Sequence, residues 1–354
     1  MSRSRRYRLF RSILIFAVIV FVGALAILSE FPGTNSRGTS TTTSPPTSPP
    51  TTPTTSPPPT FVPPGSTAGA STYQIANYTT SYSEPGRQIC LATPAGQSCG
   101  PRVIQIGAFY PAITSGSTPV PYRGYDHLGL VIFAPGFDEF YSAYSPIIDA
   151  MVNAGFVVVA INFPRTNPEA DGGLDELDEF NQPGDVSAAI SWALSANAQS
   201  SSPLYQLIDP AEVAIAGQSD GGNTVLAVAY NSCCMDSRVK AAIIYSGTEL
   251  PGFGGTFFPA GASTPMLVVQ GSADTINPPG ESTQIYTAAP SPKYLLWLLG
   301  ATHLNPYTQL DQYESITAAV TADFLKGYLN GDTSALSAMA AAGSVAGIAT
   351  FSSG

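Results

Sequence analysis

The chain has 354 residues, of which 44% are hydrophobic and 11% are charged, so it has material for one large folded domain with attachments. Its formal net charge is −10, although five arginines lie within the first eleven residues. From residue 31 onward, 23 acidic residues outnumber 9 basic ones. A body this acidic excludes nucleic acid as a partner, because phosphate backbones bind to basic surfaces.

The first seventy residues divide into three segments of different composition. Residues 1–12 are basic, residues 13–29 form an apolar run, and residues 30–70 are dominated by Ser, Thr and Pro. The apolar run is just long enough to span a bilayer, and the preceding arginines would stay in the cytoplasm. We therefore expect a single-pass signal-anchor helix and a disordered stalk, with residues 71–354 outside the cell membrane. A secretory signal cleaved near residues 24–26 is the alternative, and it also exports the domain.

Four cysteines fit an exported protein, in which an even number of cysteines indicates disulfide bonds. Of the three pairings that four cysteines allow, we favour Cys90 with Cys99 and Cys233 with Cys234. The first pair would close a short loop that contains Gly and Pro, and the second would join adjacent residues. No histidine lies near any of these cysteines, so the sequence predicts neither a metal site nor a cofactor.

From residue 71 the sequence alternates between apolar runs and segments with helical spacing. Strands are predicted at residues 73–83, 102–110, 128–134, 156–161, 213–216, 241–245, 266–270 and 293–299. Helices are predicted at residues 142–154, 183–198, 223–231, 278–288 and 309–329. This order predicts an α/β fold with right-handed crossovers and a mainly parallel central sheet flanked by helices. The acidic segment 171–179 is predicted to be a solvated loop.

The segment Gly217-Gln218-Ser219-Asp220-Gly221 links a predicted strand to a predicted helix. This G-x-S-x-G pattern at a strand–helix turn is typical of a nucleophile elbow, in which the glycines allow a strained serine to stand clear of the sheet. Parallel sheets place their sites beyond the carboxyl ends of the strands, so Ser219 is the predicted nucleophile. A Gly-rich turn with a solvated serine is the alternative.

A serine hydroxyl needs a base to take its proton, and the chain has only two histidines. His303 follows the last predicted strand and should lie at the same sheet edge as Ser219, whereas His127 precedes a strand and should lie at the opposite edge. Asp274 follows another strand and is the predicted carboxylate partner of His303, with Glu249 as the alternative. The chain order of serine, aspartate and histidine is that of an α/β-hydrolase triad.

Two backbone amides are predicted to stabilise the oxyanion that forms during ester cleavage. One is the amide of Asp220, directly after the nucleophile, and the other is the amide of Phe137, which follows the turn Pro135-Gly136 at a strand end. A loop rich in Gly and Phe follows the strand at 241–245 and supplies candidates for an acyl pocket, with packing of this loop onto the core as the alternative. The candidates are Phe253, Phe257 and Phe258.

Five pieces of sequence carry a resemblance to a known superfamily. They are VIFAPGF, the helix DVSAAISWAL, GQSDGG, VVQGSADTINPP and GATHLNP. With them, residues 102–329 resemble the α/β-hydrolase superfamily, and more narrowly the dienelactone hydrolase and platelet-activating-factor acetylhydrolase-like group, which neighbours chlorophyllases and cutinases. The resemblance implies hydrolysis of carboxylic esters through an acyl-enzyme, without a metal or cofactor. The chain has Pro135-Gly136 where many relatives have His-Gly, Gln218 where His or Trp is frequent, and an unusual Asp220.

Together these features predict an exported serine hydrolase of the carboxylesterase or lipase type, acting on small-molecule or lipid-like esters. In this hypothesis Ser219 attacks the ester carbonyl, His303 moves the proton and Asp274 orients His303. An acyltransferase or peptidase with the same triad is a second hypothesis, and a non-catalytic binding module on the cell surface is a third. The predicted contact with the membrane is made by the N-terminal helix.

Overall fold

The computed structural model describes residues 74–94, 96–115, 118–123 and 127–354. The expected basic segment 1–12, transmembrane helix 13–29 and stalk 30–70 lie outside the described residues, so these expectations stay predictions. Within the described ranges, no helix is both long and apolar enough to cross a membrane.

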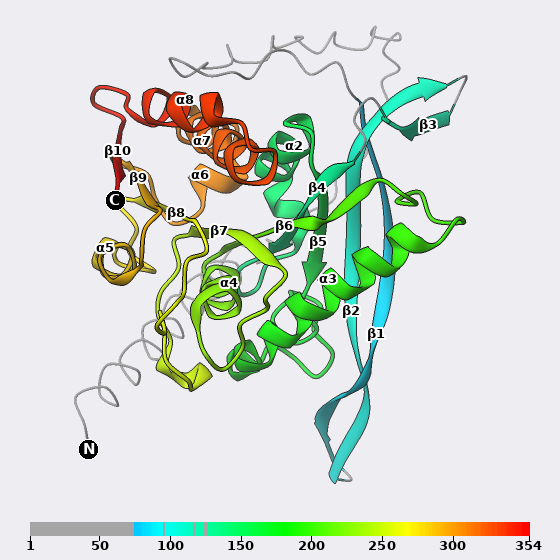
Figure 1. Cartoon of the computed structure of the whole chain (residues 1–354). Helices are drawn as coiled ribbons and strands as arrows, with labels where there is room; N and C mark the ends of the chain where they lie inside the picture. The colour runs from blue at the N-terminus through cyan, green and yellow to red at the C-terminus, as the bar shows by residue number, and fades with distance from the viewer. Residues whose placement is uncertain (1–73, 95, 116–117, 124–126) are drawn as a thin grey trace, which may run out of the picture. The chain divides into compact units, whose positions relative to one another are not determined.

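The described part of the chain is built on one ten-stranded sheet (Figure 1). Its strands are β1 (Gln74–Thr93), β2 (Gly96–Ser115), β3 (Thr118–Pro121), β4 (Leu128–Ala134), β5 (Val157–Asn162), β6 (Ile208–Gln218), β7 (Val239–Tyr245), β8 (Met266–Gly271), β9 (Lys293–Leu298) and β10 (Ala349–Ser353). They lie in the order β1-β2-β5-β4-β6-β7-β8-β9-β10, and β3 pairs with β2. Every pairing from β5 across to β9 is parallel, whereas the outer strands pair antiparallel. The predicted mainly parallel sheet is therefore confirmed.

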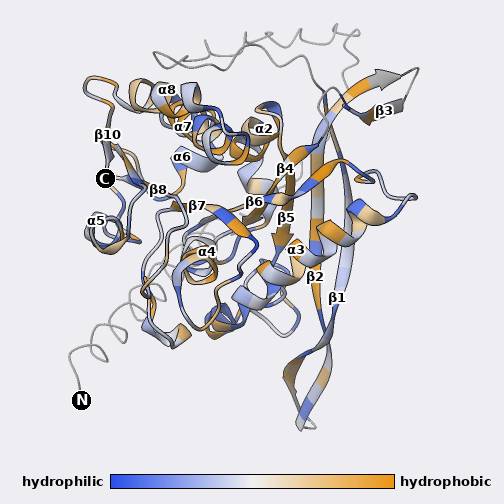
Figure 2. Ribbon diagram, in the orientation of Figure 1, coloured by the Kyte–Doolittle hydropathy of each residue, from blue (hydrophilic) through white to orange (hydrophobic). Residues whose placement is uncertain are grey.

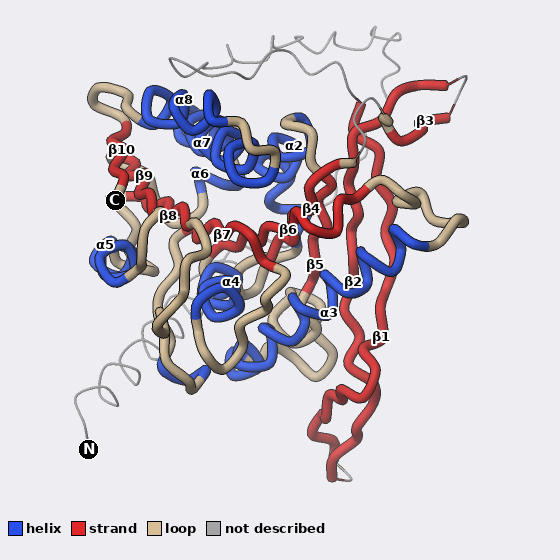
Figure 3. The backbone as a smooth tube through the Cα atoms, viewed as in Figure 1, coloured by secondary structure: helices blue, strands red, loops and turns tan. Residues whose placement is uncertain are grey.

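Helices cover both faces of this sheet (Figure 3). The helices are α2 (Ser145–Asn153), α3 (Gln182–Ala198), α4 (Asp220–Tyr230), α5 (Pro279–Ala288), α6 (Asn305–Thr308), α7 (Gln312–Leu329) and α8 (Thr333–Gly343). Three short 3-10 helices are η1 (Tyr141–Tyr144), η2 (Glu176–Asn181) and η3 (Pro251–Phe253). α3, α4 and α5 lie on one face, and α2, α6, α7 and α8 lie on the other.

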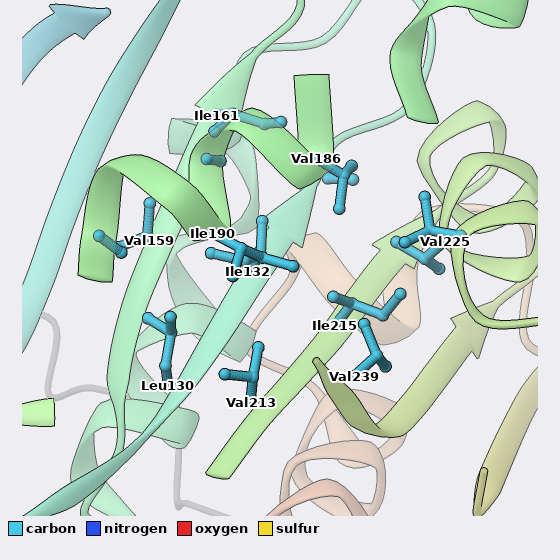
Figure 4. Packing of buried hydrophobic residues seen from close by; sticks show 14 of the residues in the cluster. Leu130, Ile132, Val159, Ile161, Val186, Ile190, Val213, Ile215, Val225 and Val239 are labelled. Atoms are coloured by element: carbon cyan, nitrogen blue, oxygen red, sulfur yellow. The ribbon is translucent and has the colours of Figure 1, made fainter. Parts of the chain in front are cut away.

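The centre of the sheet is buried on both sides. Every residue of β4 and β5 is buried, as expected for apolar strands with a helix layer on each face. Successive side chains of a strand point to opposite faces, so Ile132 packs toward α3 and α4 while its neighbour Phe133 packs toward α2 and α7. Figure 4 shows the first of these layers, formed among others by Leu130, Ile132, Val159, Val186, Ile190, Val213, Ile215 and Val225. In Figure 2, β5 is orange while the edge strand β1 is largely pale. This rigid centre holds the strand ends from which the site is built.

The hairpin of β1 and β2 is longer than the sequence predicts. β2 pairs with β5 only from Gln105 to Phe109, and the remainder of the hairpin continues past the sheet (Figure 1). Cys90 and Cys99 form the favoured disulfide, which joins facing residues of the paired strands and closes the short hairpin turn between them. In the β1 part of this outer arm, half-buried residues such as Ile89 and Leu91 alternate with exposed ones, but none of residues 87–93 is buried, so the apolar signal there is short and weak. The second favoured disulfide, Cys233–Cys234, is also present.

The prediction of a solvated loop at residues 171–179 is wrong for its last two residues. Asp178 and Glu179 are buried and belong to η2. Asp178 accepts hydrogen bonds from both Nη atoms of Arg102, at 2.8 and 2.7 Å. Glu179 accepts one from Asn223 Nδ2, at 2.8 Å. These partners are distant in the sequence, so a local run of acidic residues does not reveal that two of its members are paired and buried.

Arg102 is the centre of a charged cluster that joins the hairpin to η2 and α3. Only 2% of Arg102 is exposed, and its Nε and Nη2 each donate to Asp185 at 2.6 Å. Arg87 also donates to Asp185 and to Glu84. We call Glu84, Arg87, Arg102, Asp178 and Asp185 the Arg102 cluster. Its three carboxylates are matched by only two guanidinium groups, so one carboxylate is poorly neutralised.

Glu84 is that carboxylate, and it makes stability depend on pH. Burial raises the pKa of Glu84 from 4.5 to about 7, and Asp185 adds to the rise while Arg87 opposes it. The folded protein thus binds a proton that the unfolded chain releases between pH 4.5 and 7, so stability falls as the pH rises through this window.

We expect Glu84→Gln to remove this fall and to raise the free energy of unfolding at pH 8 by about 1–3 kcal/mol, since the neutral amide needs no proton. Urea unfolding of the oxidised protein and the variant at pH 5 and pH 8 measures it. Equal pH dependence in the two proteins would show that Glu84 titrates normally.

Candidate active site

Ser219 lies at the sharp turn between β6 and α4. Its backbone has φ 56° and ψ −120°, a left-handed conformation that is strained for a residue with a side chain. The two flanking glycines make this turn sterically allowed. A Cβ on Gly217 would lie 2.2 Å from the carbonyl oxygen of Gly221, and a Cβ on Gly221 would lie 2.1 Å from that of Ala134. The G-x-S-x-G pattern therefore has the steric role that the sequence predicts.

Ser219, His303 and Asp274 come together although they follow three different strands. Ser219 Oγ lies 2.9 Å from His303 Nε2, and His303 Nδ1 lies 2.7 Å from Asp274 Oδ2. Ser219 is 8% exposed, Asp274 is 4% exposed, and the side chain of His303 is 12% exposed. The carboxyl ends of β6, β8 and β9 lie at one edge of the sheet, which explains how residues so far apart in sequence meet.

Asp274 is held by donors on both carboxylate oxygens. Oδ1 accepts the amides of Ile276 and Asn277, each at 2.9 Å, and Oδ2 accepts Gln270 Nε2 at 3.2 Å in addition to His303. Burial alone would raise the pKa of Asp274, but the bond and charge of His303, with the two amides, lower the pKa below its ordinary value. The carboxylate thus stays ionised, and it favours the tautomer of His303 with the proton on Nδ1.

The loop that carries His303 is fixed to the loop that carries Asp274. The amide of Ala273 donates to the carbonyl of Ala301 at 2.9 Å, and the amide of Gly300 donates to Ser272 Oγ at 2.8 Å. These bonds set the distance between the two loops. They explain how the carboxylate and the imidazole are held in line.

Gln218, the residue before the serine, makes contacts that the sequence did not indicate. Its side chain is fully buried, and its Nε2 donates to the carbonyl oxygen of His303 at 3.0 Å and lies 3.2 Å from His303 Nε2. Its Oε1 accepts the hydroxyl of Tyr144 at 2.7 Å. That hydroxyl in turn accepts the amide of Gly136 at 3.1 Å. The sequence shows Gln218 only as a departure from the common His or Trp, because Tyr144 is 74 residues away.

The turn at Pro135-Gly136 lies directly against the serine. A Cβ on Gly136 would be 3.2 Å from Ser219 Cβ and 2.8 Å from Gln218 Oε1, so this turn needs glycine for its close approach. Phe137 follows this turn and is half-buried. Asp220 is the first residue of α4. The positive end of the helix dipole offers its carboxylate a favourable position there.

The other candidates lie elsewhere. The ring of Phe258 lies tilted against that of Tyr230, with centroids 5.4 Å apart, and the backbone of Phe257 forms an isolated antiparallel bridge with Asn231. Phe257 and Phe258 are partly buried and pack against the core, as the alternative for this loop predicts. Tyr230 lies at the far end of α4 from Ser219, about 16 Å along the helix.

Three further sequence candidates can be placed. Phe253 packs edge-to-face against Phe180 of η2, with ring centroids 5.4 Å apart. His127 directly precedes β4 at the opposite edge of the sheet, as expected. Glu249 follows β7, and Asp274, not Glu249, bonds to His303.

Residues 109–347 match the model of the PETase family, whose description is PET hydrolase-like. No curated protein matches the chain. The match covers Ser219, Asp274, His303 and the turn before Phe137, and it agrees with the cutinase-related neighbours that the sequence motifs resemble. Members of this family are carboxylic ester hydrolases. The chain therefore belongs to the PET hydrolase-like family of α/β-hydrolases and is an ester-hydrolysing serine hydrolase.

Proposed function

We propose that this chain cleaves carboxylic esters through an acyl-enzyme formed on Ser219. The observation that carries the proposal is the line of two hydrogen bonds, 2.7 and 2.9 Å long, that joins Asp274, His303 and Ser219. Asp274 holds the proton of His303 Nδ1, which presents the lone pair of Nε2 to the serine hydroxyl. The hydroxyl proton moves to Nε2 while the Ser219 oxygen attacks the ester carbonyl.

The amides of Phe137 and Asp220 donate to the carbonyl oxygen as it becomes an oxyanion. His303 then gives its proton to the leaving oxygen, the alcohol departs, and the acyl group is bonded to Ser219 Oγ. A water molecule next loses a proton to His303 and attacks the acyl carbonyl. The bond between the acyl carbon and Ser219 Oγ then breaks, Oγ takes back the proton from His303, and the carboxylic acid is released.

The proposed substrates are uncharged esters, including polyester chains, which is the class that the family name describes. We further propose that the reaction takes place outside the cytoplasm, on a domain held by the N-terminal anchor. The disulfides Cys90–Cys99 and Cys233–Cys234 support this location, because such bonds persist in oxidising compartments.

An assay of the full-length chain tests the reaction. p-Nitrophenyl acetate, butyrate and octanoate and bis(2-hydroxyethyl) terephthalate are offered in ¹⁸O-labelled water, with and without an added alcohol or amine acceptor. Hydrolysis predicts one ¹⁸O atom in each released acid and little transfer product. Dominant transfer to the acceptor would assign the chain as an acyltransferase. Failure to turn over any of these esters would refute the proposal.

A further inference from the structure

An unbroken path of hydrogen bonds connects the turn before Phe137 to the imidazole of His303. It runs from the amide of Gly136 to the hydroxyl of Tyr144, then to Gln218 Oε1, and from Gln218 Nε2 to the backbone oxygen and the Nε2 atom of His303. Tyr144 and Gln218 are both completely buried. Water therefore cannot replace either partner without a rearrangement of the site.

The direction of every bond in this path follows from chemistry. A backbone carbonyl only accepts, so the side-chain nitrogen of Gln218 must face the carbonyl of His303, and its oxygen must face Tyr144. An amide N–H only donates, so the hydroxyl oxygen of Tyr144 accepts from Gly136 and its proton goes to Gln218. While the His303 ring is neutral with its proton on Nδ1, no member of the path has two donors or two acceptors facing each other.

We propose that Gln218 is a positioning residue, which with Tyr144 couples the oxyanion turn to the catalytic base and sets the orientation of the His303 ring toward Ser219. This inference rests on the proposed function, because it assigns His303 the role of base. A glutamine at this position makes three contacts: with the ring of His303, with the backbone oxygen of His303, and with the Tyr144 hydroxyl that bonds to Gly136. An apolar side chain of the same size would make none of these bonds.

The contact with Nε2 also affects the proton on the ring. In the resting state, the lone pair of His303 Nε2 lies near two donors, the hydroxyl of Ser219 and Nε2 of Gln218. After His303 has taken the proton of Ser219, its own N–H faces the N–H of Gln218, and only the bond to the carbonyl of His303 remains favourable. Gln218 therefore favours the neutral ring, which opposes proton uptake from Ser219 and assists the later transfer of the proton from Nε2 to the leaving oxygen.

The charged groups around this path are carboxylates. Asp274 contacts Nδ1 of the His303 ring, on the side away from Gln218, and the charges of Glu139 and Asp220 act on Tyr144.

Three variants test the path. Gln218→Met keeps the size of the side chain and removes its polar atoms. Gln218→Glu keeps an acceptor for Tyr144 but presents a carboxylate oxygen to His303 Nε2, which would hold a proton on the ring. Tyr144→Phe removes one oxygen atom and so breaks the path at its middle.

The test measures kcat, KM and thermal unfolding for these variants with a soluble p-nitrophenyl ester from pH 6 to pH 9. Gln218→Met is expected to lower kcat by about 10- to 100-fold with KM changed less than about twofold, since the ring is misplaced while the substrate surface is intact. Gln218→Glu is expected to be less active than Gln218→Met at pH 7 and to approach it as the pH rises. Tyr144→Phe is expected to lower kcat by about 3- to 10-fold.

The double variant Tyr144→Phe with Gln218→Met is expected to be scarcely less active than Gln218→Met alone, because the two residues act as one unit. Multiplicative losses, identical pH profiles for the Met and Glu variants, or kcat within twofold of the wild type in folded Gln218→Met would each overturn the inference. If Gln218→Met fails to unfold cooperatively, unchanged kcat in Tyr144→Phe decides against the coupling. An inactive wild type would instead refute the proposed function, which separates the two failures.

Discussion

Replacing Ser219 with alanine is expected to lower kcat for a soluble ester by about 10⁴- to 10⁶-fold, as loss of a serine nucleophile does elsewhere. The substitution removes only Oγ, and alanine carries the same Cβ into the left-handed conformation at φ 56°. Folding and substrate binding should therefore change little. Adding His303→Ala to Ser219→Ala is expected to cost nothing more, since the two groups act together.

Ser246 offers a matched control for Ser219. It is a second buried serine at a strand end, it has φ 48°, and its hydroxyl lies 2.9 Å from that of Tyr307 and outside the triad. Ser246→Ala is expected to keep kcat within about threefold of the wild type. Steady-state kinetics on the purified proteins, with their thermal unfolding as a check on folding, measure both variants. A Ser219→Ala protein that retained a tenth of the wild-type kcat would contradict the assignment of the nucleophile.

Replacing Arg102 with leucine is expected to lower the free energy of unfolding by about 3–5 kcal/mol, the cost of removing one partner from a buried ion pair. Arg102 makes two bonds to Asp178 and two to Asp185, and both carboxylates are buried. Leucine leaves them with too few donors in a site that water does not reach. Urea unfolding with both disulfides intact measures the loss, and adding Asp178→Asn should recover part of it.

Arg238 separates this effect from the general cost of losing an arginine. Its guanidinium also pairs with a carboxylate, Asp236, but its side chain is 32% exposed, so water can take over the charge. Arg238→Leu is expected to cost no more than about 1 kcal/mol. If Arg102→Leu and Arg238→Leu lowered the free energy of unfolding equally, burial of the Arg102 cluster would not be the cause of the larger expected loss.

The centre of the fold and the three-residue arrangement were predictable because their signals are local. β4, β5 and β8 are short apolar runs that are buried on both faces, and each gives a continuous hydrophobic stretch in the sequence. Once these strands are parallel, their carboxyl ends share an edge. Ser219, Asp274 and His303 each follow a strand, so their meeting at that edge follows from the order of elements alone.

The features that escaped prediction depend on partners distant in the sequence. The outer arm of the β1–β2 hairpin has only a short alternation of half-buried and exposed residues, so its apolar signal is weak. In the sequence, Asp178 cannot be told from the exposed acidic residues beside it, because its partner Arg102 is 76 residues away. The contact of Gln218 with Tyr144 likewise joins residues that are distant in the sequence and lie together against the turn at Gly136.

The end of the chain shows a further limit. α8 is rich in alanine, and β10 is a short edge strand, ATFSS, that is largely exposed. α8 buries Ala335, Met339 and Ala342 on one face, but alanines also occupy its other sides, so that face gives little contrast in the sequence, and β10 has only five residues. β10 is placed by its antiparallel pairing with β9, a partner more than fifty residues earlier in the chain. Such pairings become visible only when the sheet itself is known.

Trapping the acyl-enzyme is the most direct test of the central claim. The full-length chain is mixed with excess p-nitrophenyl butyrate, quenched in acid within the first turnover, and examined by intact-mass and peptide mass spectrometry. The proposed mechanism predicts one added butyryl group, carried by Ser219, and no addition in Ser219→Ala. A butyryl group on any other residue during full turnover, or turnover that continues unchanged in Ser219→Ala, would contradict it.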